Sequence, residues 1–206
     1  MRLNLDKIVE TLRNIREYLF PVKKLTSKFS SITTLEQLKI FIQEKSAHVT
    51  QTTLYGYVKT RMGFKYTLMF ENKEFLHSLE IAKWNIYVAA LSDCTLYTFS
   101  YLMSKKNLKD NISEQIFCKI LEEEKSNGLS EKLIEESHHD FKQRLREVNW
   151  NSYYLEKPFL RSGLALYKWS PISDELKKDD KEIVLNSIKY KWNLVESEFK
   201  ELTENF

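Results

Sequence analysis

Residues 73–105 read KEFLHSLEIAKWNIYVAALSDCTLYTFSYLMSK, and this stretch decides the fold. Apolar residues occur on nearly every side of a helix drawn through it, and Asn72 just before it is a candidate N-cap. A helix that is apolar all round must be covered by other helices or by lipid. Polar residues interrupt its most apolar part, at Ser92, Asp93, Thr95, Thr98 and Ser100. The stretch therefore predicts the central helix of a bundle and no transmembrane segment.

Amphipathic segments lie on both sides of this helix and can cover it. Apolar residues recur at helical spacing over about residues 5–19, 35–62, 112–126, 131–148 and 180–202. Thr33 or Thr34 can cap the second of these segments and Gly63 can end it, while the polar run at 46–53 leaves open a kink or a break within it. Residues 150–171 are less periodic and rich in aromatic side chains, which predicts a connector packed over the bundle.

The predicted fold is all-α, a helical bundle around the central helix at about 73–105, with an aromatic connector and a covering C-terminal helix. A single helical domain is expected over residues 1–206. Within it, 1–20 is an N-terminal docking helix, 34–148 is the core bundle, and 150–206 holds the connector and the C-terminal helix. The low content of 4 Gly and 3 Pro favours few, long helices and leaves no room for a glycine-rich phosphate loop.

Charge and targeting signals narrow the setting of the protein. Lys and Arg total 32 and Asp and Glu total 29, and both signs are mixed along the chain, so no basic stripe indicates nucleic-acid binding. The first residues carry charges and no apolar targeting stretch, so we expect a cytoplasmic protein.

No metal site or cofactor is predicted. Cys94 and Cys118 have no His or Cys at ligand spacing, so we expect reduced thiols in the core. Two Glu-x-x-His spacings end at His77 and His138, and such pairs can hold two metal ions in a helical bundle. An antiparallel helix pair would leave no upstream carboxylate near Glu74, however, and His138 shares a stripe with apolar residues, so we expect it at the edge of the core.

Asp93 is the first candidate site residue. A carboxylate in the most apolar helix must be paired, hydrogen-bonded or protonated. Antiparallel packing places it level with residues 41–45, so Lys45, or His48 one turn further, is the expected partner. We expect a buried structural ion pair, with a ligand-contacting acid and solvent exposure as the alternatives.

A second candidate site lies just before Gly63. Its residues are Tyr55, Tyr57, Lys59 and Arg61. We expect Lys59 or Arg61 to pair with Glu74 or Glu71, and the alternative is a small anion-binding pocket that includes the tyrosine hydroxyls. Gly56 is the one glycine inside a predicted helix, and it marks a place where another helix or a ligand can come close.

Two further stretches carry a family pattern. Residues 53–63 read TLYGYVKTRMG, with LSD at 91–93, and residues 169–177 read WSPISDELK, with EIVLNSIK at 182–189. Together they resemble an uncharacterised, all-helical bacterial protein family, some members of which carry an esterase label. The positions that this family emphasises correspond to Tyr55, Gly56, Lys59, Arg61, Asp93, Trp169, Pro171 and Asn186. Trp169 and Asn186 become candidate site residues through this resemblance.

The leading hypothesis is a non-catalytic cytosolic protein that acts through protein–protein interaction or assembly support, with a protein partner or with itself. No G-x-S-x-G motif occurs, and the chain holds 4 Trp, 11 Tyr and 12 Phe, which are residue types that anchor interfaces. Full burial of the connector aromatics would remove this motivation; they include Tyr153, Tyr154, Phe159 and Tyr167. The alternatives are a small esterase-like hydrolase with a non-standard site, and a bundle that binds an apolar small ligand with Asp93, Lys59 or Arg61 at its mouth.

Overall fold

The computed structural model describes residues 31–63, 66–109 and 111–206, and the regular structure within these ranges is helical, with no strand. The all-α prediction is confirmed. The predicted docking helix at 1–20 lies outside the described residues.

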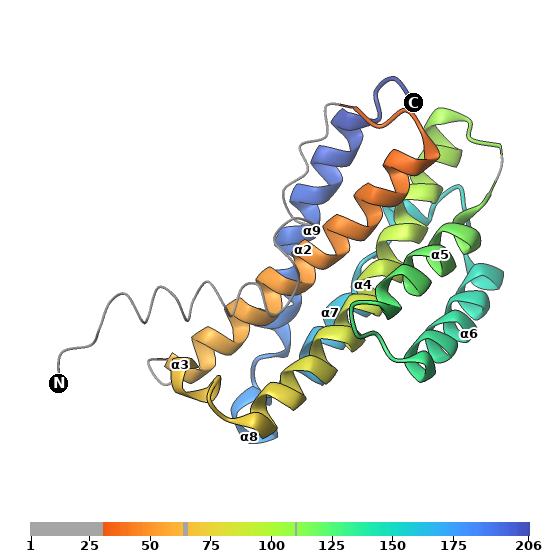
Figure 1. Ribbon diagram of the computed structural model, residues 1–206. Coiled ribbons are helices and arrows are strands. Elements are labelled where there is room, and N and C mark those ends of the chain that lie inside the picture. The colour runs from red at the N-terminus through yellow and green to blue at the C-terminus, as the bar shows by residue number, and fades with distance from the viewer. Residues whose placement is uncertain (1–30, 64–65, 110) are drawn as a thin grey trace.

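Helix α4, Lys73–Lys106, is the centre of the bundle. The side chain of Asn72 caps its first turn by accepting from the backbone N–H groups of Glu74 and Phe75, as predicted. The middle of α4 is buried on every side, and its polar residues from Ser92 to Ser100 are buried with it. Figure 1 shows α4 with other helices around it.

Helix α2, Leu35–Met62, runs antiparallel to α4. Thr34 and Gln37 form a capping box at its start, and Gly63 with a φ of 54° ends it. The helix is continuous through residues 46–53, and within it the hydroxyls of Thr52 and Thr53 donate to the backbone carbonyls of His48 and Val49. The polar run therefore neither breaks the helix nor divides it.

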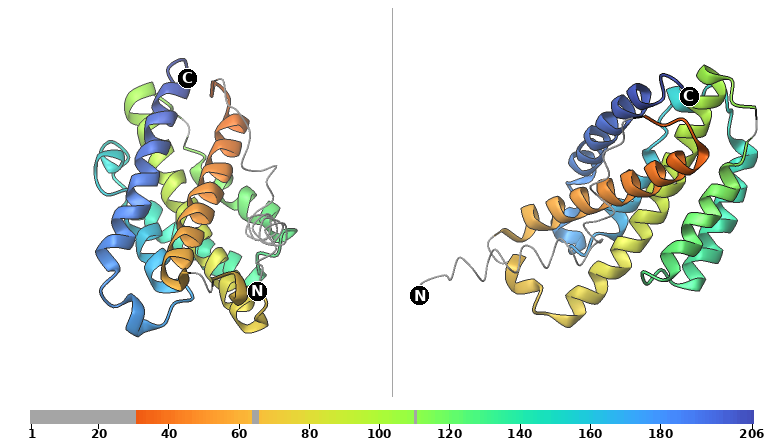
Figure 2. Two further views of the ribbon diagram at one scale, coloured as in Figure 1. Left: turned by 90° about the vertical axis from the view of Figure 1, so that its left-hand side faces the viewer. Right: turned by 45° about the horizontal axis from the view of Figure 1, so that its top comes forward.

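Two helices from the last third of the chain complete a ring of four around the core. These are α7, Leu160–Trp169, and α9, Lys181–Leu202. Going round the ring, α2 packs on α4, α4 on α7, α7 on α9, and α9 again on α2 (Figures 1 and 2). Phe41 of α2 and Phe199 of α9 meet with ring centroids 5.1 Å apart. The predicted connector thus contains a core helix, α7, which its aperiodic sequence does not indicate.

The remaining helices pack outside this ring. Helices α5, Ser113–Lys125, and α6, Glu131–Glu147, form a hairpin against α4, and Ser130 caps α6. Short helical turns connect the longer elements: α3 at Tyr66–Met69, η3 at Tyr153–Leu155 and α8 at Asp174–Lys177. At the other end, the N–H of Ile32 donates to the carbonyl of Leu202 at 2.8 Å, so the entry to α2 lies beside the end of α9.

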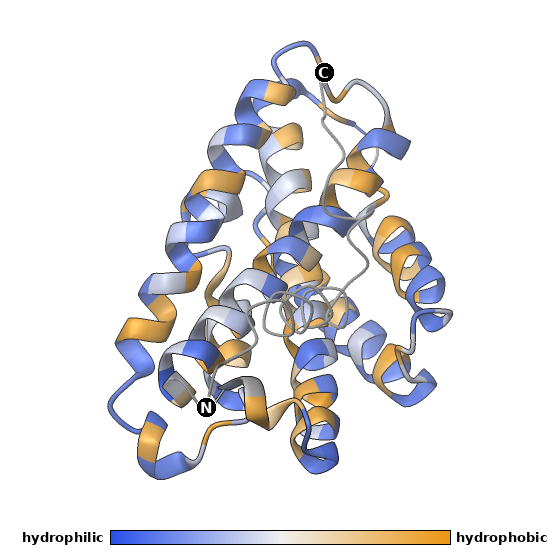
Figure 3. Ribbon diagram, turned by 60° about the vertical axis from the view of Figure 1, so that its left-hand side comes forward, coloured by the Kyte–Doolittle hydropathy of each residue, from blue (hydrophilic) through white to orange (hydrophobic). Residues whose placement is uncertain are grey.

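None of the described helices contains a sufficiently apolar stretch of membrane-spanning length. Hydrophobic and hydrophilic bands instead alternate along the outer helices (Figure 3). On α9 the inward face is buried at Val184, Ile188, Trp192, Val195 and Phe199.

Candidate functional site

Asp93 is fully buried on α4 and is held by residues of two other elements. Arg144 of α6 donates from Nη2 to Asp93 Oδ1 at 2.7 Å, and the backbone N–H of Ser162 in α7 donates to Oδ2 at 2.8 Å. Burial raises the pKa of Asp93, and the positive charge of Arg144 and the hydrogen bond from Ser162 oppose that rise. Asp93 is therefore part of a buried structural ion pair.

The partner predicted for Asp93 is wrong. Lys45 is paired with Glu198 of α9 at 2.6 Å, and His48 is exposed. The predicted position of Asp93 along α2 is nearly correct, because its neighbour Cys94 faces the Ser46 hydroxyl of α2. Burial raises the pKa of the Cys94 thiol to about 12, and that hydroxyl opposes the rise. Neighbouring helical residues diverge by about 100°, however, so Asp93 points to α6 and α7 instead.

The Asp93–Arg144 pair belongs to a network that fixes the position of α7. Arg144 Nη1 donates to Ser92 Oγ at 2.5 Å, and Nη2 also donates to the Tyr153 hydroxyl at 2.7 Å. Ser162 accepts from Trp192 Nε1 of α9 at 3.0 Å. Four long helices are thus tied through buried polar groups, and α7 is held against α9 in one orientation.

The second candidate site is an ion pair with a residue that the sequence analysis missed. Arg61 Nε donates to Asp180 Oδ2 at 2.5 Å, and the Tyr57 hydroxyl donates to the same oxygen at 2.7 Å. The predicted pairing of Arg61 with Glu74 or Glu71 is wrong. Asp180 is almost fully buried just before α9, and only the packing of α9 on α2 brings it to Arg61.

The other members of this segment lie on its opposite side. The Tyr55 hydroxyl donates to that of Tyr66 at 3.5 Å, and the Lys59 ammonium group lies 5.7 Å from the centroid of the Tyr66 ring. A Cβ added to Gly56 would meet no described atom within 4 Å, so none of the described helices packs closely against this glycine as predicted. Gly56 instead lines a hollow of about 320 Å³ together with Arg61 and Asp180, which keeps the ligand alternative open. Asp93, Lys59 and Arg61 therefore do not meet at the mouth of a common cavity.

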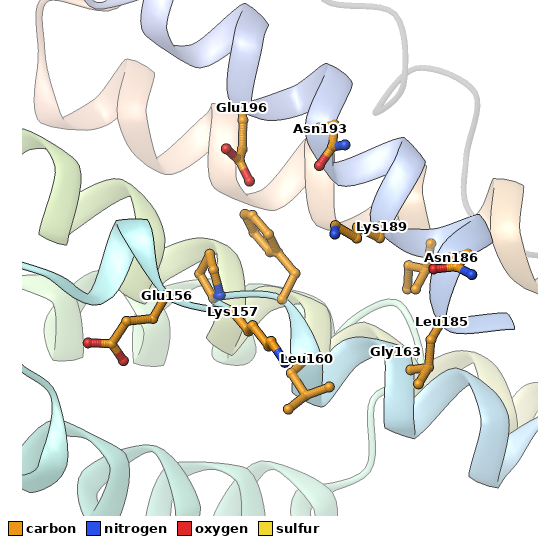
Figure 4. A pocket seen from close by; sticks show the side chains of 12 residues that line it. Glu156, Lys157, Leu160, Gly163, Leu185, Asn186, Lys189, Asn193 and Glu196 are labelled. Atoms are coloured by element: carbon orange, nitrogen blue, oxygen red, sulfur yellow. The ribbon is translucent and has the colours of Figure 1, made fainter. Parts of the chain in front are cut away.

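Asn186 lines a groove of about 290 Å³ between α7 and α9 (Figure 4). Its apolar surface comes from Pro158, Phe159, Leu160, Gly163, Leu185 and Ile188. Its polar rim comes from Glu156, Lys157, Asn186, Lys189, Asn193 and Glu196. An apolar floor with polar groups around it is the usual composition of a binding site.

Gly163 allows the two helices to approach closely at the floor of the groove. A Cβ at this position would lie 2.7 Å from Leu185 Cδ2 and 3.3 Å from Ile188 Cγ2. Phe159 stacks on Trp192 with ring centroids 4.2 Å apart, and Trp192 is itself held by Ser162. The floor is therefore rigid, and it is positioned by the same network that contains Asp93.

The rim of the groove has polar groups available for a ligand. The side-chain amides of Asn186 and Asn193 are exposed and form no hydrogen bond with the described residues. The carboxylate of Glu196 is half-buried, and burial raises its pKa against the opposing charges of Lys200 and Lys189. Sequence reasoning reached Asn186 through the family pattern and missed Asn193, although the spacing of seven residues on one helix places both on the same side.

Trp169, the remaining predicted site residue, borders another hollow of about 420 Å³ between α4, α6 and α7. The Lys168 ammonium group lies 4.9 Å from its ring centroid. Arg161 and Asp140 pair across the rim at 2.8 Å, and Arg144 lies deeper in the hollow. Both arginines of this hollow are already paired with carboxylates of the chain, so it offers less unused binding capacity than the groove.

The surroundings of the histidine and cysteine side chains show which of them could bind a metal ion or assist hydrolysis. Among the described residues, one group of potential metal ligands comes together, with ligand atoms within 4.8 Å of one another: Glu114, Cys118 and His138. The ring of His139 instead forms a hydrogen bond with the Gln143 amide at 2.9 Å. Within the described ranges, neither His138 nor His139 has a serine hydroxyl as its hydrogen-bond partner.

Comparison of the chain with protein-family models, with curated proteins and with solved structures finds no match, so the resemblance to a bacterial family stays a prediction and the function must be argued from the geometry.

Proposed function

We propose that this protein is a non-catalytic, cytosolic interaction protein that binds an extended, apolar segment of a partner protein in the groove between α7 and α9. The observation that carries the proposal is the apolar groove with two asparagine amides on its rim that form no hydrogen bond with the described residues. Two free cysteine thiols, Cys94 and Cys118, fit a reducing compartment.

The incomplete enclosure of the groove favours side chains of a protein segment over a small molecule. Pockets for drug-sized ligands have volumes of about 300–1,000 Å³ and enclose most of the ligand. The groove has about 290 Å³, at the lower end of that range, and is only partly enclosed. It therefore suits a few apolar side chains from a chain that lies across it.

The spacing of the asparagines favours an extended backbone. Asn186 and Asn193 are seven residues apart, which corresponds to about 10 Å along a helix. Three residues of extended chain cover about the same length. Because an asparagine amide can both donate and accept, each can satisfy one peptide group of the segment, and the apolar side chains then enter the groove.

The aromatic residues of the connector are not fully buried within the chain, so they remain available for contacts with a partner. Tyr153, Tyr154, Phe159 and Tyr167 are all partly buried, and none is fully buried. Phe159 presents one side to Trp192 and also lines the groove. A partly exposed aromatic ring such as that of Phe159 is typical of the centre of an interface.

The charges on the rim indicate the chemistry of the partner segment. The rim of the groove carries two positive charges, from Lys157 and Lys189, and two negative charges, from Glu156 and Glu196. A segment with an acidic residue near the lysines and a basic residue near Glu196 would complement these charges. Such rim charges act mainly on specificity and on the association rate.

The proposal is tested by photo-crosslinking in the native cell, followed by binding measurements. A photoreactive amino acid replaces Leu160, which lines the groove and is 43% exposed, and in a parallel strain it replaces Leu176 of α8, which is 56% exposed and lies outside the groove. We expect a partner protein to be crosslinked from position 160 and not from position 176. The crosslinked segment is then identified by mass spectrometry and synthesised as a peptide.

Binding of that peptide must depend on the groove. We expect Asn186→Ala and Asn193→Ala each to weaken it about 2- to 10-fold, the range for one lost hydrogen bond, and Leu160→Glu to weaken it further. Leu176→Glu and Glu201→Ala, outside the groove, serve as controls and should leave the affinity unchanged. Equal crosslinking from both positions, crosslinking only to a second copy of the chain, or full affinity in the groove variants would each refute the proposal.

A further inference from the structure

The α5–α6 hairpin brings together three side chains with different metal-binding groups. Glu114 and Cys118 lie one turn apart on α5, and His138 faces them from α6. The carboxylate, thiol and imidazole ligand atoms all lie within 4.8 Å of one another. This cluster is separate from the groove between α7 and α9, and it plays no part in the proposed function.

The arrangement is fixed by apolar packing directly beside it. Phe117, next to Cys118, stacks on Phe141, which lies three residues after His138, with ring centroids 4.0 Å apart and nearly parallel planes. Both phenylalanines are fully buried. The two helix faces that carry the cluster are therefore held in register before any ligand binds.

The imidazole of His138 has no hydrogen bond that would explain its position. Its Nε2 atom is shielded from solvent and has no hydrogen-bond partner within the described chain. Glu114 Oε1 lies 3.4 Å from this nitrogen and also 3.4 Å from Lys142 Nζ, and the His138 side chain as a whole is 37% exposed. A buried ring nitrogen that lacks a partner is costly unless something else binds it.

We propose that Glu114, Cys118 and His138 bind one Zn²⁺ ion, with water in the fourth position. Thiolate, imidazole and carboxylate are all common zinc ligands, and zinc bonds of about 2.0–2.3 Å place neighbouring ligand atoms about 3–4 Å apart in a tetrahedron. Small side-chain adjustments bring the three atoms of the cluster to that separation. Calcium and magnesium are disfavoured because they select oxygen ligands.

Zinc binding releases one proton and replaces one contact of Glu114. The Cys118 thiol loses its proton to solvent as its sulfur forms a bond to zinc, and the neutral His138 ring donates its nitrogen lone pair. Glu114 exchanges its contact with Lys142 for the metal. The two negative ligands then neutralise the divalent ion, and Lys142 is left as a competing cation nearby.

The first experiment measures metal binding to the purified, metal-free protein under reducing conditions. We expect one Zn²⁺ per chain by calorimetry. Co²⁺ used as a probe should give the visible bands of tetrahedral cobalt and the near-ultraviolet band of a sulfur–cobalt bond. Zinc should displace the cobalt and abolish both signals.

Variants assign the signals to the three residues. We expect Cys118→Ser to abolish the sulfur–cobalt band, and His138→Gln and Glu114→Gln to weaken zinc binding at least about 10-fold, because loss of an outer-shell group alone costs that much. Cys94→Ser is the matched control, since the Cys94 thiol is buried on α4, and this variant should keep the band. Circular dichroism establishes that each variant is folded.

The Lys142→Met variant distinguishes a specific metal site from nonspecific binding of metal to a surface thiol. Removal of the competing cation should tighten zinc binding about fivefold or more at low salt, with a smaller gain at high salt. Absence of the sulfur–cobalt band in the wild type, retention of the band in Cys118→Ser, or zinc affinity that is unaffected by both His138→Gln and Lys142→Met would overturn the proposal.

Discussion

Arg144 reaches from α6 to Asp93 on α4, and their side chains lie 2.7 Å apart in the interior of the bundle. The pair is surrounded by partners from other elements, with Ser92 and Tyr153 on Arg144 and Ser162 on Asp93. An ion pair so placed stabilises little in comparison with apolar packing, but the loss of one partner leaves the other charge buried.

We predict that Asp93→Asn and Arg144→Met each reduce the free energy of unfolding by about 3–5 kcal/mol. The double variant should lose clearly less than the sum of the two, because it leaves no unpaired charge behind. Urea denaturation of the four proteins measures the difference. Additive losses would mean that the two charges do not depend on one another.

Arg61 provides a second test of a pairing that the structure corrects. We predict that Arg61→Met reduces the free energy of unfolding by about 1–3 kcal/mol, because it leaves the nearly buried Asp180 with the Tyr57 hydroxyl as its remaining side-chain partner. Glu71→Gln, at a partner expected from the sequence alone, should change stability by less than about 0.5 kcal/mol. A larger loss from Glu71→Gln than from Arg61→Met would contradict the observed pairing.

The two helical glycines should respond oppositely to alanine. We predict that Gly56→Ala stabilises the protein by about 0.5–1 kcal/mol, because the new methyl group meets no atom within 4 Å and helix propensity improves. Gly163→Ala should destabilise it by about 1 kcal/mol or more, because Leu185 and the buried Ile188 must both shift. Thermal and urea unfolding of the two variants provide the comparison.

The pH dependence of stability tests the environment of Glu196. Burial raises the pKa of this carboxyl in the folded protein, so the native state keeps the proton to a higher pH than the unfolded chain does. Its stabilising contribution is complete below the unfolded pKa of about 4.3 and is lost as the pH rises through the raised folded pKa.

Glu196→Gln resembles the protonated carboxyl at every pH. We therefore predict that the variant is more stable than the wild type at pH 7, and that this advantage disappears below pH 4. Urea unfolding at both pH values measures it, with the exposed Glu201→Gln as the control. An advantage that is constant with pH would show that the carboxyl titrates normally.

Local signals in the sequence were sufficient for most helices. Caps at Thr34 and Asn72 begin their helices where the sequence places them, because capping depends on residues within one turn. Helix α7 was not predicted. It has only 10 residues, includes Gly163 and follows Pro158, and it is held by distant contacts such as the bond from Ser162 to Asp93.

The site depended on information that periodicity does not contain. The antiparallel level of Asp93 was nearly correct, but its direction around the helix axis decided the partner, and Arg144 is 51 residues away in the sequence. Asp180 reaches Arg61 across 119 residues for the same reason. Glu114, Cys118 and His138 come from two helices, so no spacing within one helix indicates that they meet.

The contact between Ile32 and Leu202 has a consequence for folding during synthesis. Residues from the first and last described helices meet in the core, at Phe41 and Phe199, so that part of the core cannot close until the ribosome has released the chain through residue 202. Until then α2 and α4 expose the apolar surface that α9 later covers. We therefore expect the newly made chain to be most exposed to aggregation just before α9 emerges from the ribosome.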